Sequence, residues 1–241
     1  MSDTEAQSAE FEARLEQAKL AALVELAYGA GHEINNPLAN IAARAQTLLA
    51  DERDPERRRK LQAIHRQAMR AHEMIADLML FARPPKLEIA ACDLRQIVLQ
   101  VADEHRDWAS ERAIEVRCEL SDTPIPIQAD ATQLAVAIAA VVTNAIEAVG
   151  KNGRVEIFAR EFVAADLRMA EVVVRDDGPG ISPAVREHLF DPFFSGREAG
   201  RGLGFGLSKC WRIVTNHDGQ ILVNNAPDGG AEFTVLLPQP S

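Results

Sequence analysis

One short segment near the N-terminus combines a nucleophile, a base and a side-chain amide: Gly31-His32-Glu33-Ile34-Asn35-Asn36-Pro37-Leu38. His32 and Asn36 are four residues apart, so on a helix they share one face. Glu33 can accept an imidazole proton and leave the other ring nitrogen of His32 free to attack a phosphoryl group. From these residues alone, a solvent-facing histidine beside an ordinary glutamate is the alternative.

A second set of residues, in the C-terminal half, is suited to hold a nucleotide. The string Asp176-Asp177-Gly178-Pro179-Gly180 follows an apolar run, and its glycines allow a sharp turn and the close approach of a ligand. A carboxylate at a strand end, such as Asp176, can accept a hydrogen bond from an exocyclic amine like that of adenine. Taken alone, the string is also compatible with a simple turn.

Two further features fit the same chemistry. The stretch Gly200–Ser208 has glycines at every second position up to Gly206 and leads into an expected helix, whose N-terminus and backbone donors suit phosphate oxygens. It lacks the GK[ST] ending of a Walker A motif, and alone it can be a flexible loop. Asn144 is a polar residue in the apolar segment Val141–Ala148, where its amide oxygen can ligate Mg²⁺ or cap a backbone group.

A helical hairpin would have to present the histidine. Apolar residues between 20 and 48 recur at helical spacing, with a stutter at Ile34 beside Pro37, where we expect a bend. After a turn at Asp51–Pro55, a second helix carries an unbroken heptad seam: Leu61, Ile64, Ala68, Ala71, Ile75, Leu78 and Ala82. Two such helices bury too little core alone, which favours dimerisation into a four-helix bundle.

Beyond the second helix, Arg83-Pro84-Pro85-Lys86 predicts a hinge, and the pattern becomes mixed α/β. Helices are expected at 93–111, 131–149 and 203–216, and strands at 114–120, 125–128, 154–160, 170–175, 220–224 and 232–237. The predicted organisation is an N-terminal tail (1–10), a helical hairpin (11–83), a hinge (84–92) and an α/β domain (93–241).

Composition limits the possible fold and function. The 241 residues are 47% hydrophobic but only 5% aromatic, which favours packed helices. The net charge of −10 argues against a nucleic-acid-binding surface. Three widely spaced cysteines predict reduced thiols rather than a metal site. No apolar run approaches 18 residues and the first ten residues are polar, so we expect no membrane segment and no secretory signal.

The string His32–Leu38 closely resembles the H-box of sensor histidine kinases. Asn144, the Asp176–Gly180 string and the Gly200–Gly206 stretch resemble, in that order, the N-box, G1-box and G2-box of an ATP-binding fold. Histidine kinases share this fold with type II topoisomerases, heat-shock chaperones and mismatch-repair ATPases. Leu189-Phe190-Asp191-Pro192-Phe193-Phe194 looks like the F-box of the kinases, and the resemblance covers the chain from about Leu20 to Leu237.

The resemblance implies an α + α/β fold class: an antiparallel helical hairpin forming a dimeric four-helix bundle, then an α/β sandwich ATP-binding domain with a mixed sheet. It implies His32 as phosphoacceptor, Glu33 as its base and Asn36 as the residue that orients water during dephosphorylation. Asp176 would recognise adenine and Asn144 would hold Mg²⁺. The implied cofactor-binding set is completed by Gly178, Gly180, Arg197, Arg201, Gly202, Gly204 and Gly206.

Three positions depart from the family pattern. Ala140 stands where the hydrolytic relatives have a glutamate, which disfavours a steady-state ATPase. Glu147 stands where many kinases carry a lysine, so the cation on the phosphate side is expected to be Arg197 or Arg201. Asp177 stands where an asparagine is usual.

The resemblance therefore implies an ATP- and Mg²⁺-dependent protein-histidine kinase that passes the phosphoryl group from His32 to an aspartate of a response-regulator receiver domain, and that can also act as its phosphatase. It implies a homodimer without nucleic-acid partners, either cytoplasmic or the soluble core of a longer, membrane-linked sensor. Two alternatives stay open. One is an ATP-binding phosphatase or scaffold without autokinase activity, suggested by Glu147; the other is an ATP-hydrolysing conformational machine, against which Ala140 argues.

Overall fold

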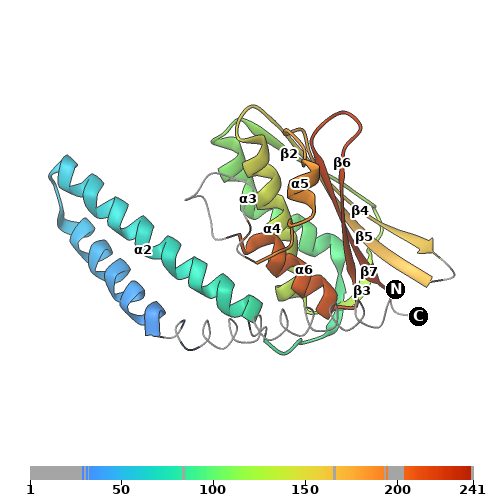
Figure 1. Ribbon diagram of the computed structural model, residues 1–241, viewed down its shortest axis with the longest axis horizontal. Helices are drawn as coiled ribbons and strands as arrows, with labels where there is room; N and C mark the ends of the chain where they lie inside the picture. Colours follow the sequence, from blue (N-terminus) through green and yellow to red (C-terminus); the bar gives the residue numbers. More distant parts are fainter. Residues whose placement is uncertain are drawn as a thin grey trace, which may run out of the picture. The chain divides into compact units, whose positions relative to one another are not determined.

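The computed structural model describes residues 29, 31, 33–82, 85–164, 167–192, 194 and 204–239 of the chain. The chain divides into two compact units, Met1–Pro85 and Lys86–Ser241 (Figure 1). The boundary between them follows the two prolines at which the hinge was predicted.

The first unit is a pair of helices. A helix runs through 33–51 without interruption at Pro37, and after a short turn α2 spans Pro55–Ala82. Asp54 starts α2, because its Oδ1 accepts hydrogen bonds from the backbone N–H groups of Glu56 (2.8 Å) and Arg57 (2.9 Å). The predicted second helix is confirmed; a bend at Pro37 stays a prediction.

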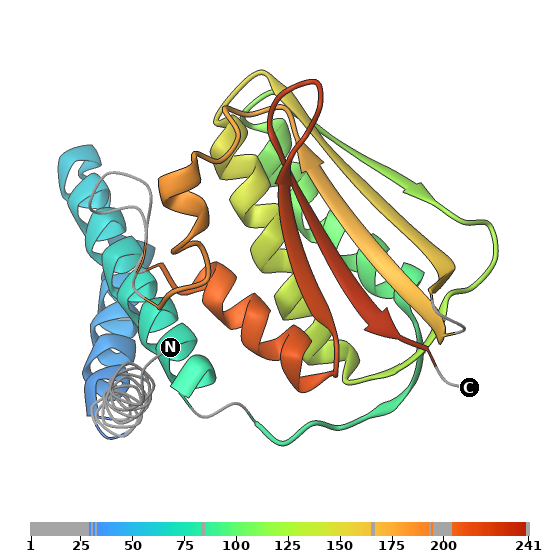
Figure 2. The same cartoon turned by 45° about the vertical axis from the view of Figure 1, so that its right-hand side comes forward.

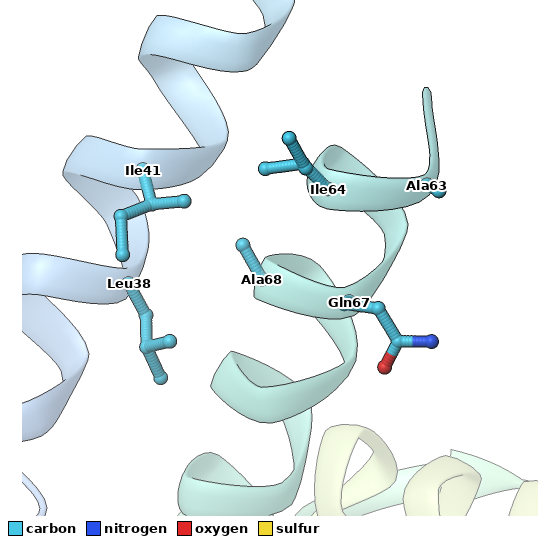
Figure 3. A pocket seen from close by; sticks show the side chains of 6 residues that line it. All are labelled: Leu38, Ile41, Ala63, Ile64, Gln67 and Ala68. Atoms are coloured by element: carbon cyan, nitrogen blue, oxygen red, sulfur yellow. The ribbon is translucent and has the colours of Figure 1, made fainter. Parts of the chain in front are cut away.

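Exposure differs among the apolar residues that the two helices turn toward each other. Ala45 and Ala68 are 3% and 5% exposed, whereas Ile41 and Ile64 remain 45% and 48% exposed. The larger side chains border an apolar groove of about 420 Å³ between the two helices, lined by Leu38, Ile41, Ala63, Ile64, Gln67 and Ala68. Figure 3 shows Ile41, Ile64 and Ala68 projecting into the space between the helices.

The second unit is a two-layer α/β structure. Its five-stranded sheet has the order β2-β4-β5-β7-β6, in which β2 and β4 are parallel and the other pairs antiparallel. Figures 1 and 2 show α3, α4 and α6 side by side on one face of this sheet. The strands are β2 (Ile114–Leu120), β4 (Gly153–Ala164), β5 (Leu167–Asp176), β6 (Gln220–Asn225) and β7 (Ala231–Pro238), and the helices are α3 (Leu94–Ser110), α4 (Ala131–Val149), α5 (Pro183–Arg186) and α6 (Gly206–Asn216).

Aspartates begin both long helices of this unit. Asp93 caps α3 by accepting a hydrogen bond from the Arg95 backbone N–H (3.0 Å), and Asp130 caps α4 through the Gln133 N–H (3.0 Å). Asp93 is the last residue of the short strand β1 (Ala90–Asp93), and Asp130 follows the short strand β3 (Pro126–Ala129). These two strands pair antiparallel in a second sheet. The segment expected as a hinge over 84–92 therefore already contains the start of β1.

Helix α4 is long and apolar enough, by length and composition, to cross a membrane. In this structure it is a core helix that packs against α3, α6, β4 and β5. Its buried residues are Gln133, Leu134, Ala137, Ile138, Val141, Val142, Ala145 and Ile146. Its apolar composition agrees with this position, because a helix that packs against neighbours on several sides is apolar on several sides.

The β4–β5 hairpin is longer than the sequence pattern predicted. The predicted strands ended at Arg160 and began at Ala170, but the observed pairing continues outward to Ala164 and Leu167. The charge at Arg160 is compatible with a strand because its cross-strand partner is Glu171, with which it forms an ion pair. Helix α5 was not predicted, and α6 begins three residues later than expected, at Gly206.

Candidate functional site

The buried carboxylate of Asp176 lies at the end of β5, a central strand of the sheet. The residue is 2% exposed. Its Oδ1 accepts hydrogen bonds from the backbone N–H groups of Gly178 (2.9 Å) and Ala231 (3.2 Å). One donor belongs to the following loop and the other to the start of β7, so these two segments together orient the carboxylate. A buried carboxylate in this position can accept a hydrogen bond from an N–H group of a bound base.

The adjacent carboxylate, Asp177, has a different role. It is exposed, and its Oδ1 accepts a hydrogen bond from the Arg154 backbone N–H at the start of β4 (2.8 Å). The Asp177 N–H in turn donates to the Arg154 carbonyl oxygen (3.3 Å). An asparagine side-chain oxygen can accept the same hydrogen bond, so this departure from the family pattern keeps the contact and adds a negative charge.

The loop after Asp176 lies against α4. A Cβ added to Gly178 would be 2.8 Å from Oδ1 of Asp176 and 3.2 Å from the carbonyl carbon of Ala148 in α4. Asn144 precedes Ala148 by four residues, so both lie on the same face of the helix. The structure thereby brings the Asn144 face of α4 to the loop that carries Asp176 and Gly178.

The turn between β6 and β7 contributes a residue that the sequence analysis missed. Asn225 ends β6, and its side chain forms hydrogen bonds with both backbone groups of Ile181, the residue after Gly180. Figure 2 shows this turn and the end of β5 at the same upper edge of the sheet. No local sequence signal marks Asn225, because its partner lies 44 residues away in the chain.

The glycine-rich stretch is described from Gly204 onward. Gly204 has a φ of +72°, and a Cβ on it would overlap the Phe194 carbonyl group. Glycine is required there both for the backbone conformation and for the contact. Gly206 is the first residue of α6, whose N-cap residue Phe205 has no side-chain acceptor, so the positive helix end suits an anion. Arg197, Arg201 and Gly202 lie outside the described residues.

Three residues in and beside the His32–Leu38 string, Gly31, Glu33 and Asn36, lie on the first helix of the hairpin. His32 lies outside the described residues. Glu33 and Asn36 are both exposed on the first helix. Gly31 is buried against α2, since a Cβ on it would lie 2.7 Å from the sulfur of Met79. The backbone carbonyl of Asn36 accepts a hydrogen bond from the Asn40 side chain (3.1 Å), whereas the Asn36 side chain lies at the surface.

A buried polar cluster joins the N-terminus of α4 to two other segments. Oδ2 of Asp130 accepts a hydrogen bond from the Glu88 backbone N–H (3.1 Å), and the Asp130 N–H donates to Nε2 of His217 (3.0 Å) at the end of α6. Nδ1 of His217 is therefore protonated and donates to the Ile213 carbonyl (2.8 Å). Burial raises the pKa of Asp130, but hydrogen bonds led by that from the Gln133 backbone outweigh burial and hold it below its ordinary 3.8.

The described residues contain no cluster of three or more His, Cys, Asp or Glu side chains that could hold a metal ion. Burial raises the pKa of the Cys210 thiol to about 12, so this cysteine is not a nucleophile at neutral pH. Glu147 is exposed near the end of α4.

Two family models match the chain. The His Kinase A (phospho-acceptor) domain matches residues 22–86, and the Histidine kinase-, DNA gyrase B-, and HSP90-like ATPase matches residues 129–241. The Signal transduction histidine-protein kinase AtoS of Escherichia coli (strain K12) is 31% identical over 95% of this chain and 37% of its own length. The sensor histidine kinase ZraS of Escherichia coli O157:H7 is 34% identical over 91% of this chain and 47% of its own.

Solved structures give the same result for the fold. Full-length ShkA in complex with AMPPNP has a TM-score of 0.76 and 26% identity, covering 90% of this chain and 46% of that one. Histidine kinase ThkA, in complex with response regulator protein TrrA, has a TM-score of 0.67 and 24% identity, covering 96% of this chain and 66% of that one. The chain spans less than half the length of the two curated relatives.

Proposed function

Because the chain belongs to the sensor histidine kinases, of which it carries the phospho-acceptor and ATP-binding domains, we propose that it is an ATP-dependent kinase that phosphorylates itself on His32. The phosphoryl group would then pass to an aspartate of a response-regulator receiver domain. The observation that carries this proposal is the buried Asp176 carboxylate, held by backbone donors at the end of β5 beside the α4 face that bears Asn144.

In this proposal the second unit binds ATP with its adenine amine donating to Asp176. The glycines of the loop let the nucleotide approach the backbone, and the start of α6 at Gly206 faces the phosphates with the positive end of its dipole. Arg197 or Arg201 would supply the positive charge that Glu147 does not. The remaining glycines of the set, Gly178, Gly180, Gly202 and Gly204, would shape the pocket and its cover.

Asn144 would hold Mg²⁺ through its amide oxygen. The fit rests on its position, because the same helix face contacts the Gly178 loop through Ala148. A magnesium ion that keeps several waters and takes phosphate oxygens needs few protein ligands, which agrees with an amide in place of a carboxylate cluster. Bound there, the ion would neutralise phosphate charge and orient the γ-phosphate.

Autophosphorylation would proceed by attack of a His32 ring nitrogen on the γ-phosphorus. The bond between that phosphorus and the bridging oxygen breaks, ADP leaves, and the proton on the other ring nitrogen of His32 passes to Glu33. Reaction requires the nucleotide of the second unit to reach the first, and the Arg83–Lys86 segment is the predicted hinge for that movement. In the phosphatase reaction, Asn36 would orient the water that attacks the phosphoaspartate of the receiver domain and releases inorganic phosphate.

The first unit would form a homodimer through its helices. Ile34, Ile41, Leu48 and Ile64 are each more than 40% exposed on the two helices, and the groove between the helices is apolar. Exposed apolar seams of this kind are covered when two hairpins form a four-helix bundle. The exposed side chains of Glu33 and Asn36 would then remain available to a receiver domain.

Incubation with ATP radiolabelled at the γ-phosphate tests the proposal. We expect an acid-labile, alkali-stable label on the wild-type chain, no label on His32→Gln, and loss of the label when a cognate receiver domain is added. If His32→Gln is labelled to the same extent as the wild-type chain, the assignment of His32 as the phosphoacceptor is wrong. Nucleotide binding without any label would instead favour the ATP-binding phosphatase or scaffold that Glu147 suggests.

A further inference from the structure

The amide of Asn225 pairs with one residue of the loop after β5. Its Oδ1 accepts a hydrogen bond from the Ile181 N–H (2.8 Å) and its Nδ2 donates to the Ile181 carbonyl (3.0 Å). Because both backbone groups of a single residue are engaged, the loop cannot slide past Asn225 without breaking both hydrogen bonds. The side chain therefore fixes the position of Ile181 rather than merely touching it.

Asn225 also lies against Gly180. A Cβ added to Gly180 would be 3.2 Å from Oδ1 of Asn225 and 3.2 Å from the Gly230 carbonyl oxygen. At the other end of the same loop, Asp176 accepts hydrogen bonds from Gly178 and from Ala231, the first residue of β7. The last residue of β6 and the first residue of β7 thus hold the loop at its two ends.

We propose that Asn225 is a positioning residue of the nucleotide site: its amide holds the far end of the Asp176–Ile181 loop in the geometry that receives ATP. This inference rests on the proposed function of Asp176 and Gly178. Asn225 does not touch the nucleotide in this proposal; it acts through the loop backbone. Without it, the loop would have to be ordered by ATP itself, and part of the binding free energy would be spent on that ordering.

The chemistry at this position is demanding. An acceptor and a donor are needed on one short side chain, and among the amino acids asparagine provides both at this length. An aspartate in its place would keep the acceptor for the Ile181 N–H but would set a carboxylate oxygen against the Ile181 carbonyl. We therefore expect Asn225→Asp to fail as a conservative replacement, although its size is unchanged.

The chain offers a matched control in the neighbouring residue. Asn224 is also exposed on β6, and because side chains alternate along a strand, it points to the opposite face of the sheet from Asn225. The experiment compares Asn225→Ala, Asn225→Asp and Asn224→Ala in the full chain. It measures the Kd for MgATP, the KM and kcat of autophosphorylation, and hydrogen exchange at the Ile181 amide.

A hydrogen bond changes an equilibrium constant by roughly two- to tenfold. Loss of two exposed ones should weaken MgATP binding about tenfold and raise KM about as much, with kcat changed less than about twofold. The Ile181 amide should exchange about tenfold faster in Asn225→Ala while the paired amides of β4 and β5 keep their protection, which a general loss of folding would not do. Asn224→Ala should behave as wild type.

Two results would overturn the inference. One is equal MgATP affinity of Asn225→Ala and Asn224→Ala; the other, which requires no variant, is a wild-type Ile181 amide that exchanges as fast as an unprotected one. Failure of the proposed function looks different, because Asp176→Asn would then bind MgATP as tightly as wild type. If Asp176→Asn binds MgATP more weakly than wild type while Asn225→Ala and Asn224→Ala bind it equally well, the nucleotide site is supported and Asn225 has no part in it.

Discussion

Two adjacent aspartates with opposite environments provide the sharpest test of the nucleotide site. Asp176 is 2% exposed and Asp177 is exposed, although both carry the same side chain at neighbouring positions. Replacing each with asparagine removes one negative charge and keeps the shape. In both variants the side-chain oxygen can still accept the native backbone hydrogen bonds, from Gly178 and Ala231 in one case and from Arg154 in the other.

The two substitutions should differ greatly in their effect on ATP. In the proposed complex, Asp176 accepts a hydrogen bond from the adenine amine, and a hydrogen bond to a charged group contributes about 1.5–3 kcal/mol. Asp176→Asn should therefore weaken MgATP binding by roughly 10- to 150-fold. The Asp177 carboxylate is committed to the Arg154 N–H, so Asp177→Asn should change the affinity less than about twofold, the scale of a weak surface effect.

Isothermal titration calorimetry of both variants with MgATP and with MgGTP would measure these differences. GTP is informative because guanine presents a carbonyl where adenine presents its amine, so the wild type should discriminate against GTP and Asp176→Asn should lose most of that discrimination. If both variants bind MgATP equally well, or if Asp177→Asn is the weaker one, the assignment of Asp176 to the adenine is wrong.

The geometry supports three other predictions. Gly204→Ala should lower the free energy of unfolding by about 1–3 kcal/mol in urea titrations and raise the KM for ATP, because its Cβ would meet the Phe194 carbonyl at a positive φ. Asp130→Asn keeps the cap acceptor for the Gln133 N–H but sets an amide NH2 against the Glu88 N–H, so it should cost about 1 kcal/mol at pH 7. Since hydrogen bonds depress the pKa of Asp130, the contribution of its carboxylate is present above pH 3.8, and the difference from wild type should vanish as the pH falls through that lowered pKa. If the first unit forms the proposed homodimer, Ile64→Glu should make the chain monomeric in analytical ultracentrifugation, whereas Arg66→Glu, on the opposite side of α2, should leave it dimeric.

The sequence was most informative where a local pattern determined the structure. The predicted bounds of β2 and α4 match the observed ones, Ile114–Leu120 and Ala131–Val149. In β2 the alternation of apolar and polar residues indicates a strand, and in α4 the long apolar run at helical spacing indicates a helix. The glycines and Asp176 were predicted as site residues from their type and order alone, and that assignment stays a prediction. These features share one property: the residues that create each of them are close together in the chain.

Long-range pairing could not be inferred in the same way. Strand β1 is four residues long and exists because it pairs with β3, more than thirty residues later, so the hinge was predicted to extend over it. The role of Asp177 depends on Arg154 across the β4–β5 hairpin, and that of Asn225 on Ile181. Each contact is made between residues that only the folded sheet brings together, and a single sequence contains no record of it.

The way Asp176 is held bears on how much sequence change the site can absorb. The hydrogen bonds to its Oδ1 come from the backbone N–H groups of Gly178 and Ala231, so these two contacts depend on the path of the chain rather than on particular side chains. A chain 31–34% identical to its relatives can keep such a carboxylate in place as long as the loop and the β6–β7 turn retain their shape. Asn225 is different, because its hydrogen bonds come from a side chain. Ala231 is 3% exposed, so only a replacement of similar size tests this difference. Nucleotide affinity should therefore tolerate Ala231→Ser, which keeps the backbone N–H, more readily than Asn225→Ala.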